Sequence, residues 1–244
     1  MTDRESVALE EAFLLHQRAY RNTSQIIECF TRSYGVVALV AQGSRRPRGG
    51  QRALLQPFVP LRVSWVRRGE LGRLTSVELR EFVGELGGQS LLASFYLNEL
   101  ILRLLARGDA NADAYSCYSR ALAELRRGAD TAATLRIFEL GLLEALGYGL
   151  NLYDTFDTDE PIRAEIRYRF EPEHGARAVD AEASAGDIFW GHELISLRDG
   201  TLGEESSLRA AKRLLSRALQ LYLGDRPLRT RAVLKDLLDA GIEL

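Results

Sequence analysis

The sequence predicts an α+β fold in which a small β-barrel is followed by a helical domain. Two observations support this prediction. The first eighty residues contain short runs rich in β-branched and aromatic residues, separated by turn-forming residues and by no helical pattern. After the stretch GELGGQS (84–90), apolar residues recur mostly at the three- and four-residue spacing of a helix. We therefore expect two domains, over residues 1–82 and 83–244.

Five strands are expected in the N-terminal domain, and most end at a short turn. Their ranges are 11–20, 25–31, 36–42, 59–66 and 71–79. Gly35, which can adopt a positive φ, lies in the turn before the third strand. Five such strands are most economically arranged as a closed antiparallel barrel of the OB type, because closure removes exposed edges. An SH3-like barrel would leave nearly the same pattern in the sequence.

The helical domain is predicted to begin with three consecutive helices that pack as a bundle. The first begins at Leu91, the second covers about 112–127, and the third begins near Asp130, whose side chain is a suitable N-cap. Short loops join these three helices. Beyond them the sequence predicts a short hairpin over 165–179 that turns at EPEHG (171–175), and further helices over about 187–198, 205–223 and 228–239.

Composition indicates a globular protein. Of its 244 residues, 46% are hydrophobic and 27% are charged, which suits an ordinary core and a solvated surface. There is no run of about 18 apolar residues, so no membrane span is expected. The start of the chain carries acids where a signal peptide needs basic and then apolar residues, so we expect a cytoplasmic protein. Cys29 and Cys117 lack the spacing of a zinc motif, and we expect them to be reduced, with no metal or other cofactor.

Motifs of enzymes are absent from the sequence. It contains no GxxxxGK[ST] phosphate loop, no GxSxG elbow and no HExxH pair. The three histidines are His16, His174 and His192, and His192 with Glu193 could be imagined as an acid–base pair. No nucleophile or orienting residue lies near this pair in the sequence. We therefore expect a protein without catalytic chemistry.

The charge of the first eighty residues is the strongest functional signal. The whole chain has a formal charge of -2, but residues 1–80 carry 13 arginines against 7 acids. The stretch GSRRPRGGQR (43–52) alone holds four arginines, three glycines, one proline and no acid. The guanidinium fork matches phosphate oxygens, and its plane stacks on bases. We expect this loop to bind the backbone of single-stranded nucleic acid; a merely solvated loop is the alternative.

The charge distribution nominates two sets of nucleic-acid-binding residues. Those of the barrel are Arg21, Arg45, Arg46, Arg48, Arg52, Arg67 and Arg68. The others are Arg213 and Arg217, which share a face of the predicted helix 205–223 with Arg209 and Lys212, although this face could simply be solvated. Three aromatic residues of the N-terminal domain could either stack on bases or pack inside the barrel: Tyr20, Tyr34 and Trp65.

Five stretches of the sequence resemble, in order and spacing, the RecO family of bacterial recombination mediators. They are RALLQPFVPL (52–61), SFYLNELILRLL (94–105), LRIFELGLLEALGYGLNL (135–152), RYRFEPEHG (167–175) and LRAAKRLLSRALQLYLGDRPLRTR (208–231). The resemblance implies an N-terminal OB fold, a helical domain and a non-enzymatic role. That role is to bind single- and double-stranded DNA, to anneal complementary strands and to help a recombinase replace single-stranded-DNA-binding protein (SSB). It also implies two protein partners, RecR and the acidic, phenylalanine-terminated tail of SSB, and we expect the chain itself to be a monomer.

The chain departs from many members of this family in one respect. Those members carry a four-cysteine zinc module in the C-terminal domain, about where the predicted hairpin lies. Residues 150–182 contain no cysteine. We therefore expect a loop and a hairpin without metal in this position.

The resemblance also directs attention to a pocket for the SSB tail, which needs an apolar cavity rimmed by arginine. Arg136 is the first candidate to hold the terminal carboxylate, and Arg103 and Arg126 could assist it. The alternative is that Arg136 pairs with a nearby acid such as Glu139 or Glu144. The alternative function is that of an adaptor that docks the SSB tail or RecR while its contact with DNA is incidental.

Overall fold

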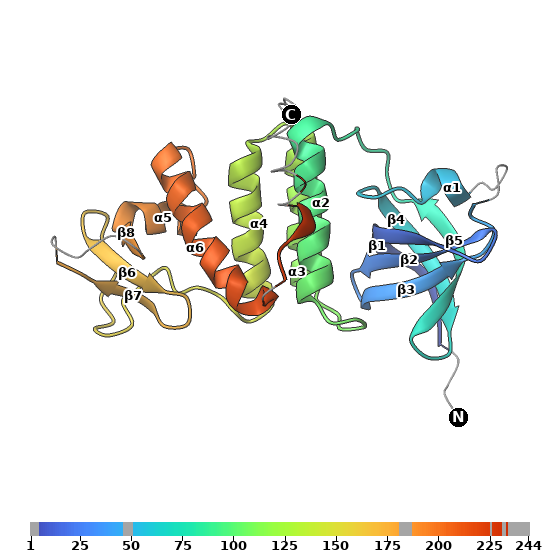
Figure 1. Cartoon of the computed structure of the whole chain (residues 1–244), viewed down its shortest axis with the longest axis horizontal. Coiled ribbons are helices and arrows are strands. Elements are labelled where there is room, and N and C mark those ends of the chain that lie inside the picture. The colour runs from blue at the N-terminus through green and yellow to red at the C-terminus, as the bar shows by residue number, and fades with distance from the viewer. Residues whose placement is uncertain (1–4, 46–50, 181–186, 225, 231–232, 234–244) are drawn as a thin grey trace. The chain divides into compact units, whose positions relative to one another are not determined.

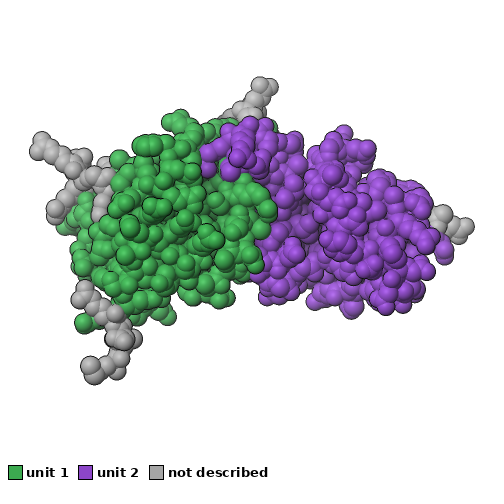
Figure 2. All heavy atoms as spheres, turned by 180° about the vertical axis from the view of Figure 1, so that it is seen from behind, with its two compact units in different colours: residues 1–122, 228–244 green, residues 123–227 purple. Residues whose placement is uncertain are grey.

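The computed structural model describes residues 5–45, 51–180, 187–224, 226–230 and 233 (Figure 1). Arg46 and Arg48, and most of the helix predicted over 228–239, lie outside these residues. The chain forms two compact units, residues 1–122 with 228–244 and residues 123–227 (Figure 2). The first unit holds the barrel together with the helices that follow it. The domain boundary at 82–83 stays a prediction.

The five strands of the first unit close into a barrel, which confirms the predicted OB-type fold. They are β1 (Glu5–Tyr20), β2 (Ser24–Thr31), β3 (Gly35–Ala41), β4 (Pro60–Arg67) and β5 (Leu71–Leu79), in the order β1-β2-β3-β5-β4. β1 begins before the predicted strand, because its first half pairs with β4 and its second half with β2. A short helix that was not predicted, α1 (Gln51–Leu54), precedes β4.

The expectation that the barrel is antiparallel throughout was wrong at one pair of strands. β3 and β5 are parallel, whereas the other neighbours are antiparallel. The reason is geometric, since strand directions that alternate around a closed ring require an even number of strands. A ring of five must therefore contain a parallel pair.

Alternate residues of the strands fill the barrel interior. Leu39, Leu61, Val63 and Trp65 belong to this core and are fully buried. Trp65 therefore packs inside the barrel, and it is not a stacking platform for bases. Tyr34 is half-buried with its ring edge-on to Trp65, at 5.2 Å between centroids.

The outer face of β1 and β2 packs against α2 (Gly88–Leu104) and α3 (Ala112–Arg126), of which α3 belongs to this unit up to Leu122. The rings of Phe13 and Tyr118 lie 5.1 Å apart, and other ring pairs of the same strands and α3 are similarly close. Buried Asn98 of α2 donates to the Leu15 carbonyl at 2.8 Å and accepts a hydrogen bond from the Tyr118 hydroxyl. This packing covers one side of the barrel.

The predicted glycine turn before β3 is confirmed. Glycine is required here because two backbone segments approach each other closely. Gly35 has φ 62°, and a Cβ atom at this position would lie 2.0 Å from the Asp109 carbonyl oxygen. The backbone N–H of Gly108 donates to the Val36 carbonyl at 3.0 Å. A side chain at residue 35 would therefore push the barrel away from the loop that connects α2 and α3.

In its described part, the second unit contains three helices and a small sheet. The helices are α4 (Thr131–Ala145), α5 (Gly191–Asp199) and α6 (Glu205–Leu223). α6 packs against both α4 and α5. Asp130 caps α4 as predicted, because its side chain accepts a hydrogen bond from the Ala133 backbone N–H at 2.7 Å.

The small sheet has the order β7-β6-β8 and consists of β6 (Arg167–Glu171), β7 (Gly175–Ala178) and β8 (Ile188–Trp190). The predicted hairpin is thus present and carries a third strand. The prediction that a helix begins at 187 was wrong, because residues 188–190 pair with β6 before α5 begins. Glu193 accepts a hydrogen bond from the Trp190 backbone N–H at 2.9 Å, so its carboxylate caps α5.

An apolar core holds the small sheet together, since Tyr168, Phe170, Ala176 and Phe189 are all buried. Among the residues that the structure describes, no group of three or more His, Cys, Asp or Glu is arranged to hold a metal ion. Neither cysteine forms a disulfide, and burial raises the pKa of Cys29 to about 12. None of the described helices combines the length and apolarity that a membrane span requires.

Candidate nucleic-acid interface

An open groove of about 480 Å³ on the outer surface of the barrel brings four arginines together. We call it the basic groove. It is lined by Tyr20, Arg21, Val40, Gln42, Val66, Arg67, Arg68, Leu71, Gly72 and Arg73. No acid is among these lining residues, so the groove combines positive charge with apolar side chains.

Strand register explains why residues so distant in sequence meet in the basic groove. Arg73 of β5 lies opposite Val40 of β3 on one side and opposite Val66 of β4 on the other. Because neighbouring strands are about 4.8 Å apart, partners in register stand side by side on one face. The end of β4 and the turn after it add Arg67 and Arg68, and the turn from β1 to β2 adds Arg21.

The arginines of the basic groove differ in the contacts that they make within the protein. The guanidinium groups of Arg68 and Arg73 are exposed and have no hydrogen-bond or ion-pair partner in the described part of the chain. The Arg21 guanidinium carbon lies 5.2 Å from the centroid of the Tyr20 ring, a cation–π distance. Arg67 donates through Nε to the Glu5 carboxylate. Arg21, Arg68 and Arg73 are therefore available to an anionic ligand.

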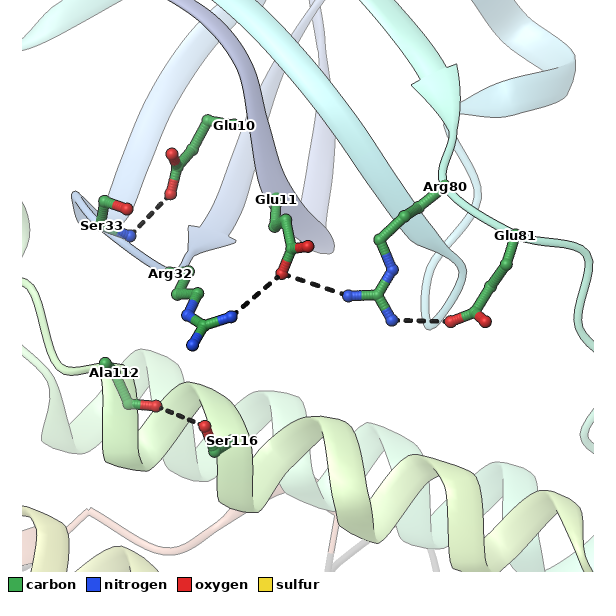
Figure 3. A network of polar contacts seen from close by, with 8 residues as sticks. All are labelled: Glu10, Glu11, Arg32, Ser33, Arg80, Glu81, Ala112 and Ser116. Atoms are coloured by element: carbon green, nitrogen blue, oxygen red, sulfur yellow. Dashed lines mark hydrogen bonds and ion pairs between the residues drawn. The ribbon is translucent and has the colours of Figure 1, made fainter.

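The arginines on the helix-facing side of the barrel are, by contrast, engaged with carboxylates (Figure 3). Glu11 lies between Arg32 and Arg80, with N–O distances of 3.7 and 3.2 Å, and Arg80 also donates to Glu81 at 2.7 Å. The hydrogen bond to Glu81 and the charge of Glu11 raise the pKa of Arg80, against the opposing effect of its partial burial. Burial, followed by the charge of Glu11, raises the pKa of the Tyr115 phenol on α3. These charges serve the junction of the barrel with α3.

The predicted arginine loop is described only at its ends. Arg45 is exposed, and its backbone N–H donates to the Thr23 carbonyl at 3.0 Å. This bond ties the start of the loop to the β1–β2 turn that carries Arg21. Arg52 lies in α1, but its side chain, like the whole of Arg46 and Arg48, is outside the description. The role of the loop itself stays a prediction.

Sequence reasoning counted Arg73 only toward the positive charge of the domain and did not nominate it as a site residue. The alternation along β5 could have found it, because Gly72 and Leu74 are buried while Arg73 between them is exposed. What the pattern could not supply is the identity of the neighbouring strands. Only the closed order of the barrel places Arg73 beside Val40 and Val66.

The predicted basic face of α6 is largely engaged within the second unit. Arg213 donates to the Ile188 carbonyl at 2.7 Å, and its guanidinium carbon lies 4.2 Å from the centroid of the Phe189 ring. Arg217 forms an ion pair with Asp187. Both arginines thus attach α6 to β8 and to the residue that precedes it. Their contact with nucleic acid stays a prediction.

The structure also shows what surrounds the residues proposed for the SSB tail. Arg136 is only 7% exposed, and its Nη2 lies 2.7 Å from Glu139 Oε1, so it pairs with one of the two acids considered from the sequence. Arg103 and Arg126 are half-buried. Arg103 belongs to the first unit, whereas Arg126 and Arg136 belong to the second. A tail carboxylate would have to replace Glu139 to reach Arg136.

A closed five-stranded barrel with an arginine-lined groove, followed by a helical region, defines a protein of the OB-fold class with a basic surface. Two family models match the chain: "Recombination protein O N terminal" over residues 6–83 and "Recombination protein O C terminal" over residues 88–232. The chain therefore belongs to the RecO family. This membership confirms the family resemblance and the predicted class of non-enzymatic recombination and DNA repair mediator.

Curated relatives agree with this assignment over nearly their whole length. The DNA repair protein RecO of Nitrosococcus oceani is 43% identical over 235 residues, which cover 96% of each chain. That of Methylococcus capsulatus is 40% identical, covering 96% of this chain and 95% of the relative. The RecO protein of Alkalilimnicola ehrlichii is 42% identical, and the match covers 95% of this chain and 92% of the relative.

Proposed function

We propose that the protein acts in DNA repair by holding single-stranded DNA in the basic groove, through the phosphates and with little readout of sequence. The observation that carries this proposal is the pair Arg68 and Arg73, two exposed guanidinium groups without a partner among the described residues. Arginine presents donors in a fork that fits phosphate oxygens. A polyanion would supply the negative charge that the groove itself lacks.

The lining of the groove suits a flexible single strand. Val40, Val66 and Leu71 offer apolar contact to sugars and bases, and Tyr20 offers a ring on which a base can stack. The guanidinium group of Arg21 lies over the Tyr20 ring. It can donate to a phosphate while it remains stacked on this ring. Neutralised phosphates repel one another less, so a second, complementary strand can approach. Annealing would follow from this electrostatic effect.

Charge reversal of the three available arginines tests the proposal. A variant with Arg21→Glu, Arg68→Glu and Arg73→Glu should bind a labelled deoxythymidine oligonucleotide at least about 100-fold more weakly in dilute salt, because about three phosphate contacts are lost. The slope of log affinity on log salt should become shallower by about 2, at about 0.7 per phosphate. Fluorescence anisotropy at several salt concentrations measures both quantities.

Arg62 provides the matched control for this experiment. It is an exposed arginine on the same strand β4, but it is outside the basic groove and lies in register with Glu11 and Glu78. Arg62→Glu should leave the affinity within about twofold, since no phosphate contact is lost. If the triple variant binds like the unaltered protein, the groove is not the DNA site, and the adaptor function becomes the better account.

We propose the family's other partners for this chain as well, together with a location in the cytoplasm at the nucleoid. These partners are double-stranded DNA, RecR and the SSB tail, the last held by Arg136 with help from Arg103 and Arg126. Arg136→Gln alone would deprive the buried Glu139 carboxylate of this ion pair and could unfold the unit. The double variant Arg136→Gln with Glu139→Gln replaces the ion pair with two neutral amides.

A folded double variant should lose binding of the tail peptide, because the cation that would hold its carboxylate is gone. Its affinity for DNA should be unchanged, since neither residue lines the basic groove. Anisotropy with a labelled tail peptide and with a labelled oligonucleotide measures the two affinities. Undiminished peptide binding would remove Arg136 from this role.

A further inference from the structure

The outer face of the small sheet in the second unit has an unusual composition. Side chains alternate along the strands, so one face of the sheet is the buried apolar core already described. The other face carries Arg167, Arg169 and Glu171 from β6, Arg177 from β7, and Ile188 and Trp190 from β8. We call these six residues the sheet face. Three of them are arginines and one is a tryptophan that is 45% exposed.

Two of these arginines face each other directly. Arg169 lies opposite Arg177 across the β6–β7 ladder, and opposite Ile188 on its other side. Like charges in directly opposed positions destabilise a sheet. Stability of the fold does not explain this pair. An anionic ligand that bridges both guanidinium groups would convert the repulsion into attraction.

Neither arginine is firmly engaged within the protein. Arg169 is exposed, and its guanidinium has no hydrogen-bond or ion-pair partner in the described ranges of the chain. Arg177 donates to Asp157 at 3.0 Å, but the two side chains are 64% and 31% exposed. Ion pairs that are open to water contribute little, about 0 to 1 kcal/mol. A phosphate could therefore displace or share this contact.

The sheet face also supplies an aromatic surface. The Arg167 guanidinium carbon lies 5.8 Å from the centroid of the Trp190 ring, and the His192 ring lies 6.2 Å away at an angle of 24°. The backbone of Trp190 is fixed by its pairing with Arg167 and by its hydrogen bond to Glu193. Proteins that bind single-stranded nucleic acids commonly combine an exposed aromatic ring with arginines. Bases stack on the ring, and the phosphates contact the cations.

An open hollow of about 670 Å³ adjoins these residues. Its lining includes Arg169 and Arg177, and also the two acids Glu171 and Asp180. The Glu171 carboxylate lies 3.5 Å from Nδ1 of His174. The negative charge of the two acids opposes a polyanion, so binding here should be weaker than in the basic groove.

We propose that the sheet face is a second binding site for single-stranded nucleic acid, with Arg169 and Arg177 on the phosphates and Trp190 stacked on a base. An acidic peptide fits less well, because its carboxylate needs one clamp at an apolar pocket, whereas these cations are spread over a flat face beside an indole. The site stands on residues of the second unit alone and does not depend on the basic groove. With both sites present, one chain binds two strands, which is the arrangement that an annealing protein needs.

Trp190 itself reports on this site. The chain has two tryptophans, and Trp65 is fully buried in the barrel, so iodide should quench chiefly the fluorescence of Trp190. A deoxythymidine oligonucleotide of about 8 nucleotides, within the usual size of such sites, should protect this fluorescence from iodide. In the double variant Arg169→Gln with Arg177→Gln, the oligonucleotide affinity measured by this protection should fall at least about fivefold. This is the effect expected when one or two phosphate contacts are lost in moderate salt.

Two controls separate this proposal from the function proposed for the barrel. The triple variant of the basic groove should keep the protection of Trp190 even though its anisotropy signal for tight binding is lost. Arg127→Gln, which alters an exposed arginine of the second unit outside the sheet face, should change neither signal. The proposal is overturned if the oligonucleotide leaves Trp190 open to iodide, if the double variant is protected as before, or if only an acidic peptide gives protection.

Discussion

The two sides of the barrel carry the same residue type, but their arginines differ in the partners they have. On the helix-facing side, Arg32 and Arg80 share Glu11, and their charges serve the junction with α3 (Figure 3). In the basic groove, Arg68 and Arg73 have no such partner among the described residues. What separates an arginine engaged in the fold from one that stays available to a ligand is therefore the position of the nearest carboxylate. The number of arginines in the domain does not distinguish the two.

The largest expected effect on stability comes from truncating a side chain of the barrel core, which lies beneath both sides. Trp65→Ala should lower the free energy of unfolding by about 3 to 5 kcal/mol, because a large, fully buried side chain leaves a cavity. Urea denaturation measures this loss. Leu71→Ala, at an exposed position on β5 in the basic groove, is the control and should cost less than about 1 kcal/mol. A Trp65→Ala protein as stable as its parent would contradict the barrel core described above.

A smaller effect should distinguish the helix-facing side from the groove. Glu11→Gln leaves Arg32 and Arg80 without their shared carboxylate, and should cost about 1 to 2 kcal/mol of stability. The affinity for oligonucleotides should stay the same, because neither arginine belongs to the basic groove. Denaturation and anisotropy on the same protein give both values. The distinction between the two sides fails if Glu11→Gln weakens DNA binding as strongly as charge reversal in the groove does.

The smallest effect concerns a carboxylate of the first unit that accepts hydrogen bonds from the backbone. Glu99 of α2 accepts from the backbone N–H groups of Arg229 and Thr230 and from the Thr230 hydroxyl. Burial acts to raise the pKa of Glu99, but these bonds and the charge of Arg103 outweigh it, and the pKa lies below its ordinary value of 4.5. The folded protein thus binds this proton less readily than the unfolded chain.

The sign of the pH dependence follows from that lowered pKa. The stabilisation by Glu99 is fully present above pH 4.5 and disappears as the pH falls through the lower pKa of the folded state. Glu99→Gln should cost about 1 kcal/mol or less near neutral pH, and the difference from the parent should shrink in acid. Thermal unfolding at several pH values measures it. A difference that is constant with pH would show that the charge of Glu99 contributes nothing.

Local patterns were sufficient for most of the secondary structure. Alternation located the five strands, helical spacing located α2, α3, α4 and α6, and Asp130 was identified as the cap of α4. The strand at 188–190 was missed because three residues carry too little periodicity, and their conformation depends on pairing with β6. The early start of β1 was missed for a similar reason, since residues 5–7 become a strand by pairing with β4.

The candidate sites depended more on tertiary structure. Arg21, Arg67 and Arg68 were nominated from charge alone, and the barrel brings them together with Arg73. Charge alone did not reveal that Arg213 and Arg217 are engaged beside β8, because the Ile188 carbonyl and Asp187 lie far from them in sequence. The sheet face escaped notice for the same reason. Arg169 and Arg177 become neighbours only across the β6–β7 ladder.

By itself, the sequence determined the order of barrel and helices and the excess of positive charge in the first eighty residues, since these depend on local spacing and composition. It also carried the resemblance to the RecO family, in five stretches that agree in order. Only the tertiary structure decided which arginines a carboxylate neutralises and which stay available to a ligand. The physical reason is the short range of hydrogen bonds and ion pairs in water. An arginine's partner is set by the few ångströms around its guanidinium group, and strand pairing fills that space with residues from distant parts of the chain.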